Sequence, residues 1–157
     1  MERIWAPWRI EYIRKKKSDG CILCEILKQD EDISNYILYR DVENAIILNS
    51  YPYNPGHLMI FPYKHIANLE NLTEKERNEH FALVSRSTKV LRQAFNSEGF
   101  NIGINLGKVA GAGIDGHVHT HIVPRWQGDA NFMPVLGETR VLPEALAETY
   151  QKLAGKF

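Results

Sequence analysis

The chain has 157 residues, a mass of 18.0 kDa and 19 basic against 19 acidic side chains, so its formal net charge is zero. This length suits one domain with a hydrophobic core and is too short for two ordinary ones, which predicts a single domain over residues 1–157. Apolar residues make up 44% and charged residues 24%, which excludes a disordered or collagen-like chain. Neutral charge also argues against a nucleic-acid or acidic-membrane binder, because such binding needs an excess of Lys and Arg.

The N-terminal arm, residues 1–17, departs from this balance. It carries six basic and two acidic side chains, for a net charge of +4, together with the aromatic residues Trp5, Trp8 and Tyr12. We expect an arm with a short helix that packs on its own domain or on a partner subunit.

Two features of the sequence bear on its cellular location: the lack of membrane-spanning or signal segments, and the pair of cysteines. No apolar run approaches the ~20 residues that span a bilayer, and the amino terminus lacks the apolar segment of a signal peptide. We therefore expect a cytoplasmic protein with no membrane partner. Cys21 and Cys24 are the only cysteines. They lie too close for a useful structural disulfide, so the pair is typical of metal ligation or redox chemistry.

Three short strands are predicted in the first half of the chain. Tyr36–Arg40 and Asn44–Leu48 are rich in Tyr, Ile and Leu and are separated by Asp41, a pattern typical of a hairpin. His57–Phe61 follows the turn sequence Tyr-Pro-Tyr-Asn-Pro-Gly and forms the third predicted strand.

A long helix is predicted to begin at Thr73. Glu76 lies three residues later, which makes a capping box in which each side chain satisfies the other residue's free backbone N–H. The helix should end near Gly99, with His80 exposed to solvent among charged neighbours. Apolar residues at steps of three and four predict the face that packs on a sheet: Phe81, Val84, Leu91 and Phe95, with Thr88 between them.

The last third of the chain returns to strands. Phe100–Leu106 and His117–Val123 flank a glycine-rich loop, and Pro143 opens a terminal helix that runs to about Leu153. Strands joined by short turns, then one long helix, then more strands predict an α+β fold with a mainly antiparallel sheet, one long helix and a C-terminal helix.

Three of the six histidines fall at alternating positions, His117, His119 and His121. In a strand, side chains alternate between faces, so all three imidazoles would project from one side with ~6.6 Å between neighbours. Three titratable rings on one face cost burial energy without building a core, which indicates a functional site.

Such an arrangement fits two chemistries. In a metal-dependent hydrolase, His117, His119 and either His57 or His121 would ligate a catalytic metal that keeps one position open for water. Alternatively, a neutral imidazole is the nucleophile and its neighbours fix its tautomer and protonate the leaving group. A third interpretation is a nucleotide-sensing module that binds without turnover.

The loop ahead of the histidines favours the nucleophilic interpretation. Residues 107–116 concentrate glycines, whose backbone N–H groups can converge on an anion. Between residues 101 and 131, the only fully charged side chains are Lys108, Asp115, Arg125 and Asp129. A phosphate site here would therefore depend on imidazoles and backbone amides, which suits a small phosphate ester better than a long polyanion.

The segment His117-Val-His-Thr-His-Ile-Val resembles the signature of the histidine triad (HIT) family. Asn49 to His57 and Asn105 are also similar to family positions. Trp5-Ala-Pro-Trp-Arg and the stretch from Pro124 to Phe132 resemble a bacterial and archaeal branch of diadenosine tetraphosphate phosphorylases or hydrolases.

The resemblance implies an enzyme that cleaves a dinucleoside polyphosphate, or a related adenosine phosphoester, at the α-phosphorus. The middle histidine, His119, would be the nucleophile that forms a covalent nucleotidyl-histidine, which water or phosphate then resolves. His121 would bond the leaving group or phosphate, and His57 would approach from the neighbouring strand. A purine nucleotide partner and a homodimer or homotetramer are implied as well.

Further binding roles follow from the same resemblance. Asn49 would accept the ribose hydroxyls, and Asn105 would hold the phosphate together with the backbone of Gly111 and Gly113. Trp126 would stack on a base or pack at a subunit boundary. Several relatives have Ser, Thr or Gln where this chain has Gly113 and Ile114, so a side-chain donor is missing from that part of the loop.

Relatives that contain zinc imply a structural site in this chain. Its ligands would be Cys21, Cys24, His65 and His117, and it would tether the amino-terminal segment to the triad. Two reduced structural thiols and a redox pair remain the alternatives for the two cysteines.

Overall fold

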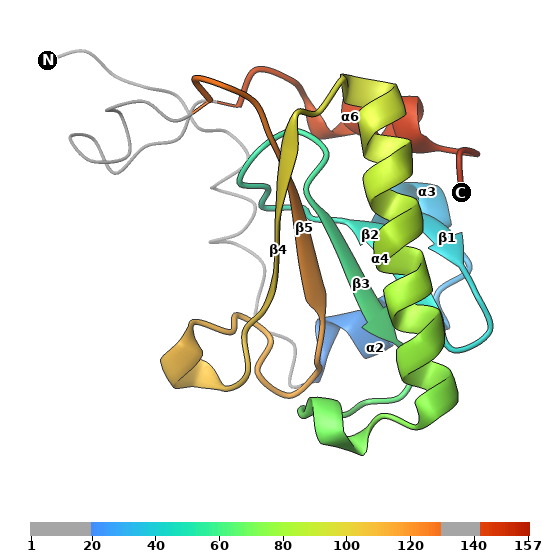
Figure 1. Ribbon diagram of the computed structural model, residues 1–157. Helices are drawn as coiled ribbons and strands as arrows, with labels where there is room; N and C mark the ends of the chain where they lie inside the picture. The colour runs from blue at the N-terminus through green and yellow to red at the C-terminus, as the bar shows by residue number, and fades with distance from the viewer. Residues whose placement is uncertain (1–19, 130–141) are drawn as a thin grey trace, which may run out of the picture.

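The computed structural model describes residues 20–129 and 142–157, so the predicted arm at residues 1–17 lies outside the described residues. Five strands form one sheet in the order β1-β2-β3-β5-β4, and every neighbouring pair is antiparallel (Figure 1). Their bounds are β1 Ile37–Arg40, β2 Asn44–Leu48, β3 Leu58–Pro62, β4 Gly99–Ile104 and β5 Thr120–Arg125. The α+β fold with an antiparallel sheet is confirmed.

The predicted hairpin is present, but the later strands are displaced along the chain. β3 begins one residue after His57, β4 ends before Asn105, and β5 begins three residues after His117. The residues predicted at these strand ends lie in turns and loops instead, because their backbone groups form hydrogen bonds with residues outside the neighbouring strands. Val118 N, for example, donates to Ile66 O at 2.7 Å.

The sheet separates two layers of apolar side chains. Ile46 and Ile60 pack toward α4 (Glu74–Phe95), whereas Ile47 and Met59 pack on the opposite face toward α2 (Ile22–Lys28). Successive strand residues alternate between faces, so short strands with continuous apolar sequence supply both layers. Figure 1 shows α4 crossing one face of the sheet and α2 lying near the end of β3.

Helix α4 begins with the predicted capping box. Thr73 Oγ1 accepts from Glu76 N at 3.2 Å, and Thr73 N donates to Glu76 Oε2 at 2.6 Å. The helix ends at Phe95 with Asn96 in the left-handed conformation, so Asn96, not Gly99, terminates it. Gly99 instead opens β4.

The buried face of α4 agrees with the prediction in part, since Val84 and Leu91 are buried and Phe95 packs against the same core. Phe81 is 55% exposed, whereas His80 is 1% exposed and faces the sheet. The prediction counted apolar residues only, so it included the exposed Phe81 and left out the polar side chains that pack against the sheet. The buried positions are Glu76, His80, Leu83, Val84, Ser87, Val90 and Leu91.

The remaining elements are short. A small helix, α3 (Asp32–Asn35), leads into β1, and 3-10 turns η1 (Leu69–Asn71) and η2 (Lys108–Ala110) lie in the loops. The terminal helix α6 is confirmed over Leu146–Leu153, a few residues after Pro143. Across the described stretches of the chain, none of the helices is long and apolar enough to span a membrane.

Candidate active site and metal centre

The three triad histidines divide between two neighbouring sites. Only His121 lies in β5, while His117 and His119 precede it in extended loop backbone. The rings of His119 and His121 are in T-shaped contact at 4.9 Å, but His117 makes its T-shaped contact with His65 at 5.3 Å. The expectation that all three histidines lie in one strand is therefore wrong, because the strand begins only at Thr120. Their shared side of the sheet is kept, since His117 contacts Phe61 and His121 pairs with Met59, which belong to the same apolar layer.

His119 is held in one tautomer by the backbone. It is 3% exposed, and its Nδ1 lies 2.7 Å from His117 O. A carbonyl oxygen only accepts, so Nδ1 carries the proton and donates it. The other ring nitrogen, Nε2, is then left with its lone pair in the neutral ring.

A directed chain of hydrogen bonds sets the tautomer of His121. Tyr53 N donates to His57 Nδ1 at 3.1 Å, so His57 carries its proton on Nε2. His57 Nε2 lies 2.9 Å from His121 Nδ1, which therefore accepts. The remaining nitrogen of His121, Nε2, then bears an N–H.

Burial keeps His121 uncharged at neutral pH. Desolvation, with a smaller contribution from neighbouring His119, lowers the pKa of His121 to about 4. At neutral pH this imidazole is therefore a hydrogen-bond donor through Nε2 and carries no charge.

The turn before β3 delivers His57 to this cluster. Gly56 has φ +77°, and a Cβ there would lie 3.1 Å from Leu91 Cδ2, so the turn requires glycine. Asn54 Nδ2 donates to Pro124 O and to Asp129 Oδ2, both at 2.9 Å. These bonds attach the turn to the far end of β5.

An ion pair completes that attachment. Arg125 Nη2 lies 2.6 Å from Asp129 Oδ1, and Arg125 Nε donates to Asp129 Oδ2 at 2.7 Å. The hydrogen bonds from Arg125, supported by Trp126 N and Asn54, lower the pKa of Asp129 to about 2. The carboxylate therefore stays charged and keeps the turn in place over the ordinary pH range.

Asn49, the residue that the family resemblance assigns to the ribose hydroxyls, lies next to His57. Its Nδ2 is 3.3 Å from His57 Nδ1, and its Oδ1 accepts from Tyr51 N at 2.9 Å. An amide oxygen has two lone pairs, so Oδ1 keeps one for a ligand hydroxyl.

The predicted phosphate loop lies between β4 and β5. Asn105 directly follows β4 and is half-buried, while Gly111 and Gly113 are exposed. Gly111 has φ +86°, which favours glycine, and a Cβ at Gly113 would meet no atom within 4 Å. The loop backbone is therefore open on the side of both glycines.

Trp126 lies at the opposite end of β5 from His119. Its Nε1 donates to Phe95 O at 3.1 Å, and its backbone N donates to Asp129 Oδ2 at 3.1 Å. The indole N–H thus binds one of the last carbonyls of α4 within the same chain.

The four predicted metal ligands converge. Cys21, Cys24, His65 and His117 place their ligand atoms within 4.8 Å of one another. Sγ of Cys21 lies 3.3 Å from His117 Nδ1, and Sγ of Cys24 lies 3.3 Å from His65 Nδ1. Sulfur and nitrogen ligands on a tetrahedral zinc ion would be ~3.5 Å apart, so the group is suited to zinc.

The protonation of the group also suits a cation. His117 Nε2 donates to Pro62 O at 2.8 Å, which leaves Nδ1 unprotonated and facing the sulfurs. Burial, together with the neighbouring Cys21 thiol, raises the pKa of Cys24. A divalent cation would stabilise the thiolates that this environment otherwise disfavours, and its binding would release protons.

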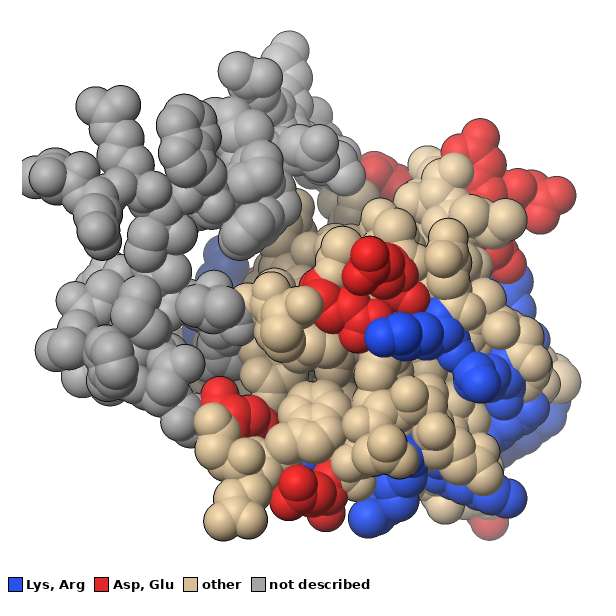
Figure 2. All heavy atoms as spheres, turned by 90° about the horizontal axis from the view of Figure 1, so that it is seen from above, with Lys and Arg blue, Asp and Glu red and all other residues tan. Residues whose placement is uncertain are grey.

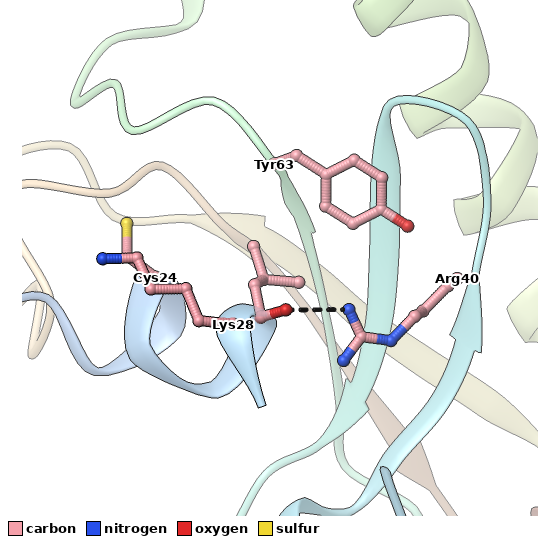
Figure 3. A pocket seen from close by; sticks show the side chains of 5 residues that line it. Cys24, Lys28, Arg40 and Tyr63 are labelled. Carbon is pink, nitrogen blue, oxygen red and sulfur yellow. Dashed lines mark hydrogen bonds between the residues drawn. The ribbon is translucent and has the colours of Figure 1, made fainter. Parts of the chain in front are cut away.

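Helix α2, which carries Cys24, is fixed to β1 by Arg40. The guanidinium donates to Leu27 O at 3.2 Å (Figure 3). It also donates to Asp32 Oδ1 at 2.8 Å. A shallow pocket here is lined by Cys24, Leu27, Lys28, Arg40 and Tyr63. Because Arg40 is already bonded to carbonyl and carboxylate oxygens, it fixes the helix and is not free to bind an anion.

His80 is a buried structural residue, although the sequence predicts it to be exposed to solvent. Instead of being exposed, it bonds Asn44 and Thr120 between α4 and the sheet. Its neighbours in sequence are charged, which masked its position on the inner face. Only the phase of Leu83, Val84 and Leu91 along the helix could have revealed it.

Comparison with known proteins now identifies the class that the antiparallel sheet and the histidine cluster define. The HIT domain matches residues 30–128. The chain therefore belongs to the histidine triad family, as its sequence motif indicated.

Individual relatives agree with this assignment. A Mycobacterium tuberculosis protein named AP-4-A phosphorylase is 37% identical over 100% of this chain and 85% of its own length. Bis(5'-nucleosyl)-tetraphosphatase [asymmetrical] of Schizosaccharomyces pombe is 33% identical over 62% of this chain and 53% of that protein. The structure of a Zn-bound histidine triad family protein from Mycobacterium smegmatis covers 87% of this chain and 92% of its own, with a TM-score of 0.70 and 28% identity.

Proposed function

We propose that the protein is a nucleotidyl transferase that cleaves dinucleoside polyphosphates, or related adenosine phosphoesters, at the α-phosphorus. The observation that carries this proposal is the pair of tautomers at the triad. His119 presents an unprotonated Nε2 and His121 an Nε2–H, and their rings are in contact. One ring can attack while its neighbour donates a hydrogen bond.

The first step follows from this geometry. Nε2 of His119 forms a bond to the α-phosphorus, and the bond from phosphorus to the bridging oxygen of the leaving nucleotide breaks. The N–H of His121 stabilises negative charge as it develops on oxygen. The product is a nucleotidyl-His119 and a released nucleoside polyphosphate.

The second step returns the histidine to its starting state. An oxygen of inorganic phosphate or of water attacks the same phosphorus, and the bond to His119 breaks. The full-length likeness to a protein named AP-4-A phosphorylase supports phosphate as the acceptor. Water is the second candidate, supported by the likeness to a tetraphosphatase.

Binding of the nucleotide is assigned to groups around the two rings. We assign Asn49 to the ribose hydroxyls, and Asn105 with the backbone of Gly111 and Gly113 to the phosphate. Trp126 is retained as a base-stacking candidate through its ring face, since its N–H is already bonded. Side chains of both charges occur on the face shown in Figure 2.

Zinc has a structural role in this proposal. Cys21, Cys24, His65 and His117 would hold it, and it would supply a cross-link between α2 and the triad loop. The competing metal-dependent mechanism needs His117 and His119 on one ion. Within residues 20–129 and 142–157, the only potential metal-binding group is the four-residue one, which contains His117 but not His119.

We also propose that the protein is a cytoplasmic homodimer. Among residues 20–129 and 142–157, strand β4 is at the edge of the sheet and pairs only with β5, and Ile102 on it is 47% exposed. An open edge with exposed apolar residues can pair with a second copy. Thiolate ligands at Cys21 and Cys24 fit a reducing compartment. Sedimentation equilibrium measures the oligomeric state, and a monomer would contradict the dimer.

The decisive experiment incubates wild type and His119→Asn with diadenosine tetraphosphate, with and without inorganic phosphate, and identifies products by mass. Phosphorolysis yields ADP and ATP only with phosphate, whereas hydrolysis yields AMP and ATP without it. His119→Asn should lose at least about a thousandfold in kcat and all covalent nucleotidyl-protein in acid-quenched samples. Full activity of this variant would refute the mechanism, and nucleotide binding without turnover by wild type would favour a sensing module.

A further inference from the structure

A buried polar chain lies beneath the triad, on the opposite face of the sheet. His80 of α4 is 1% exposed. Its Nδ1 is 2.9 Å from Asn44 Oδ1 on β2, and its Nε2 is 2.6 Å from Thr120 Oγ1 on β5. One imidazole thus joins two strands that are not adjacent in the sheet.

The direction of each hydrogen bond in this chain can be assigned. Asn44 Nδ2 donates to Glu79 Oε1 at 3.1 Å and to Glu76 O at 3.2 Å, so Asn44 Oδ1 is the acceptor toward His80. His80 therefore carries its proton on Nδ1 and accepts through Nε2 from the Thr120 hydroxyl. Desolvation lowers the pKa of His80 to about 4, which keeps the ring neutral and this direction fixed at physiological pH.

The chain is anchored at its far end. Glu79 Oε1 also accepts from Glu43 N at 2.8 Å, just before β2. The order of donation is Thr120 to His80, His80 to Asn44, and Asn44 to the Glu79 carboxylate. Each side chain in the network therefore has a hydrogen-bond partner, so its burial makes the network rigid and does not leave an unsatisfied polar group that would destabilise the fold.

Thr120 is the residue between His119 and His121. Its side chain contacts His80 on the α4 face, whereas His121 pairs with Met59, which packs on the other face. Thr120 is also the first residue of β5, where its backbone is paired with Ile60 and Ile104. A displacement of Thr120 would therefore move both adjacent imidazoles.

We propose that the hydrogen-bonded chain of Thr120, His80, Asn44 and Glu79 positions the triad for nucleotidyl transfer, with Thr120 and His80 as positioning residues. The inference rests on the proposed function and deepens it. Apolar side chains of similar shape could fill the space of Thr120 and His80 without loss of packing. What their hydrogen bond adds is a fixed orientation of Thr120, and a fixed distance from α4, at the start of β5.

Kinetics of Thr120→Val test the proposal, since valine keeps the shape of threonine and removes its hydroxyl. We expect kcat to fall about tenfold with KM within twofold, and Thr120→Ser to restore kcat to within twofold of wild type. Leu83→Ala is the matched control, because it removes a buried apolar contact of the same helix and leaves the chain intact. It should lower the melting temperature without lowering kcat. Equal losses of kcat in Thr120→Val and Leu83→Ala would overturn the proposal.

A second readout does not depend on turnover. In nitrogen-15 NMR of labelled histidines, wild type should show His80 as the neutral Nδ1–H tautomer. His80→Phe should shift the ring signals of His119 and His121, which it does not touch, while Leu83→Ala leaves them unchanged. If His80→Phe fails to fold, the same comparison is made with His80→Gln. Unmoved signals would overturn the positioning role, whereas shifted signals in a protein without nucleotide turnover would refute only the proposed function.

Discussion

Hydrogen-bond direction gives different properties to histidines that look equivalent in the sequence. The ring of His119 is oriented by a backbone carbonyl, that of His121 by His57, and that of His117 by Pro62 O. The result is one free lone pair, one free N–H and one potential metal ligand. The different roles of the three histidines therefore depend on the hydrogen-bond partner of each ring nitrogen and not on the residue type.

Gly56 is the backbone position on which the placement of His57 depends. We expect Gly56→Ala to lower the free energy of unfolding by about 2 kcal/mol, because a side chain is strained in the left-handed region. The added Cβ would also press on Leu91, Pro124 and Phe95 at 3.1–3.3 Å. Urea unfolding measures the change. Gly99→Ala is the matched control, since its nearest neighbour would be Arg125 Cβ at 4.0 Å. Equal losses in both variants would contradict this account.

At the scale of elements, the metal group joins α2 to two loops that flank the paired strands β3 and β5. Cys21 and Cys24 belong to the first turn of α2, His65 to the loop after β3, and His117 to the loop before β5. Arg40 ties the C-terminal end of α2 to β1, so the helix is anchored at both ends. A metal ion would thereby hold the loop whose carbonyl, His117 O, orients His119.

Zinc removal tests this tether. We expect one equivalent of zinc in the purified protein. At free zinc a thousandfold above Kd, the ion should contribute about 4 kcal/mol, so chelation should lower the melting temperature by about 10 °C. Elemental analysis and calorimetry measure both. Cys24→Ser should melt low already and respond little to chelator. Absence of zinc together with unchanged melting in chelator would exclude the site.

At the scale of the whole molecule, two buried neutral imidazoles make stability depend on pH. The folded pKa values of His80 and His121 are lowered to about 4, mainly by desolvation. Below about pH 6.5 these two imidazoles become protonated in the unfolded chain but stay neutral in the folded protein. The free energy of unfolding therefore falls as pH drops from about 6.5 toward 4, with each group contributing up to about 1.4 kcal/mol per pH unit.

His80→Phe isolates one of these contributions. Between pH 6 and 5, the loss of unfolding free energy should be smaller in this variant than in wild type by about 1 kcal/mol. The metal group and His121 are present in both proteins, so the difference between the two slopes reports mainly the loss of His80. Urea titrations at a series of pH values measure the slopes. Identical slopes would show that His80 does not resist protonation in the folded protein.

Local patterns were sufficient to predict much of the fold. The hairpin at β1 and β2 and the start of α4 depend on neighbouring residues, through apolar runs and the Thr73–Glu76 capping box. Residue types and the family signature also led to the metal group, although its members are up to 96 residues apart. These predictions succeeded because the information is either local or carried by rare residue types.

Tertiary structure decided what local patterns could not. It showed that β5 begins at Thr120, so that His117 and His119 lie in the preceding loop and only His121 lies in the strand. It also placed His80 inside and Phe81 outside, because Asn44 and Thr120 supply the hydrogen bonds that make a buried imidazole acceptable. The sequence by itself determined which chemical groups are present, whereas the tautomer and partner of each histidine depend on atoms brought together from distant strands and loops.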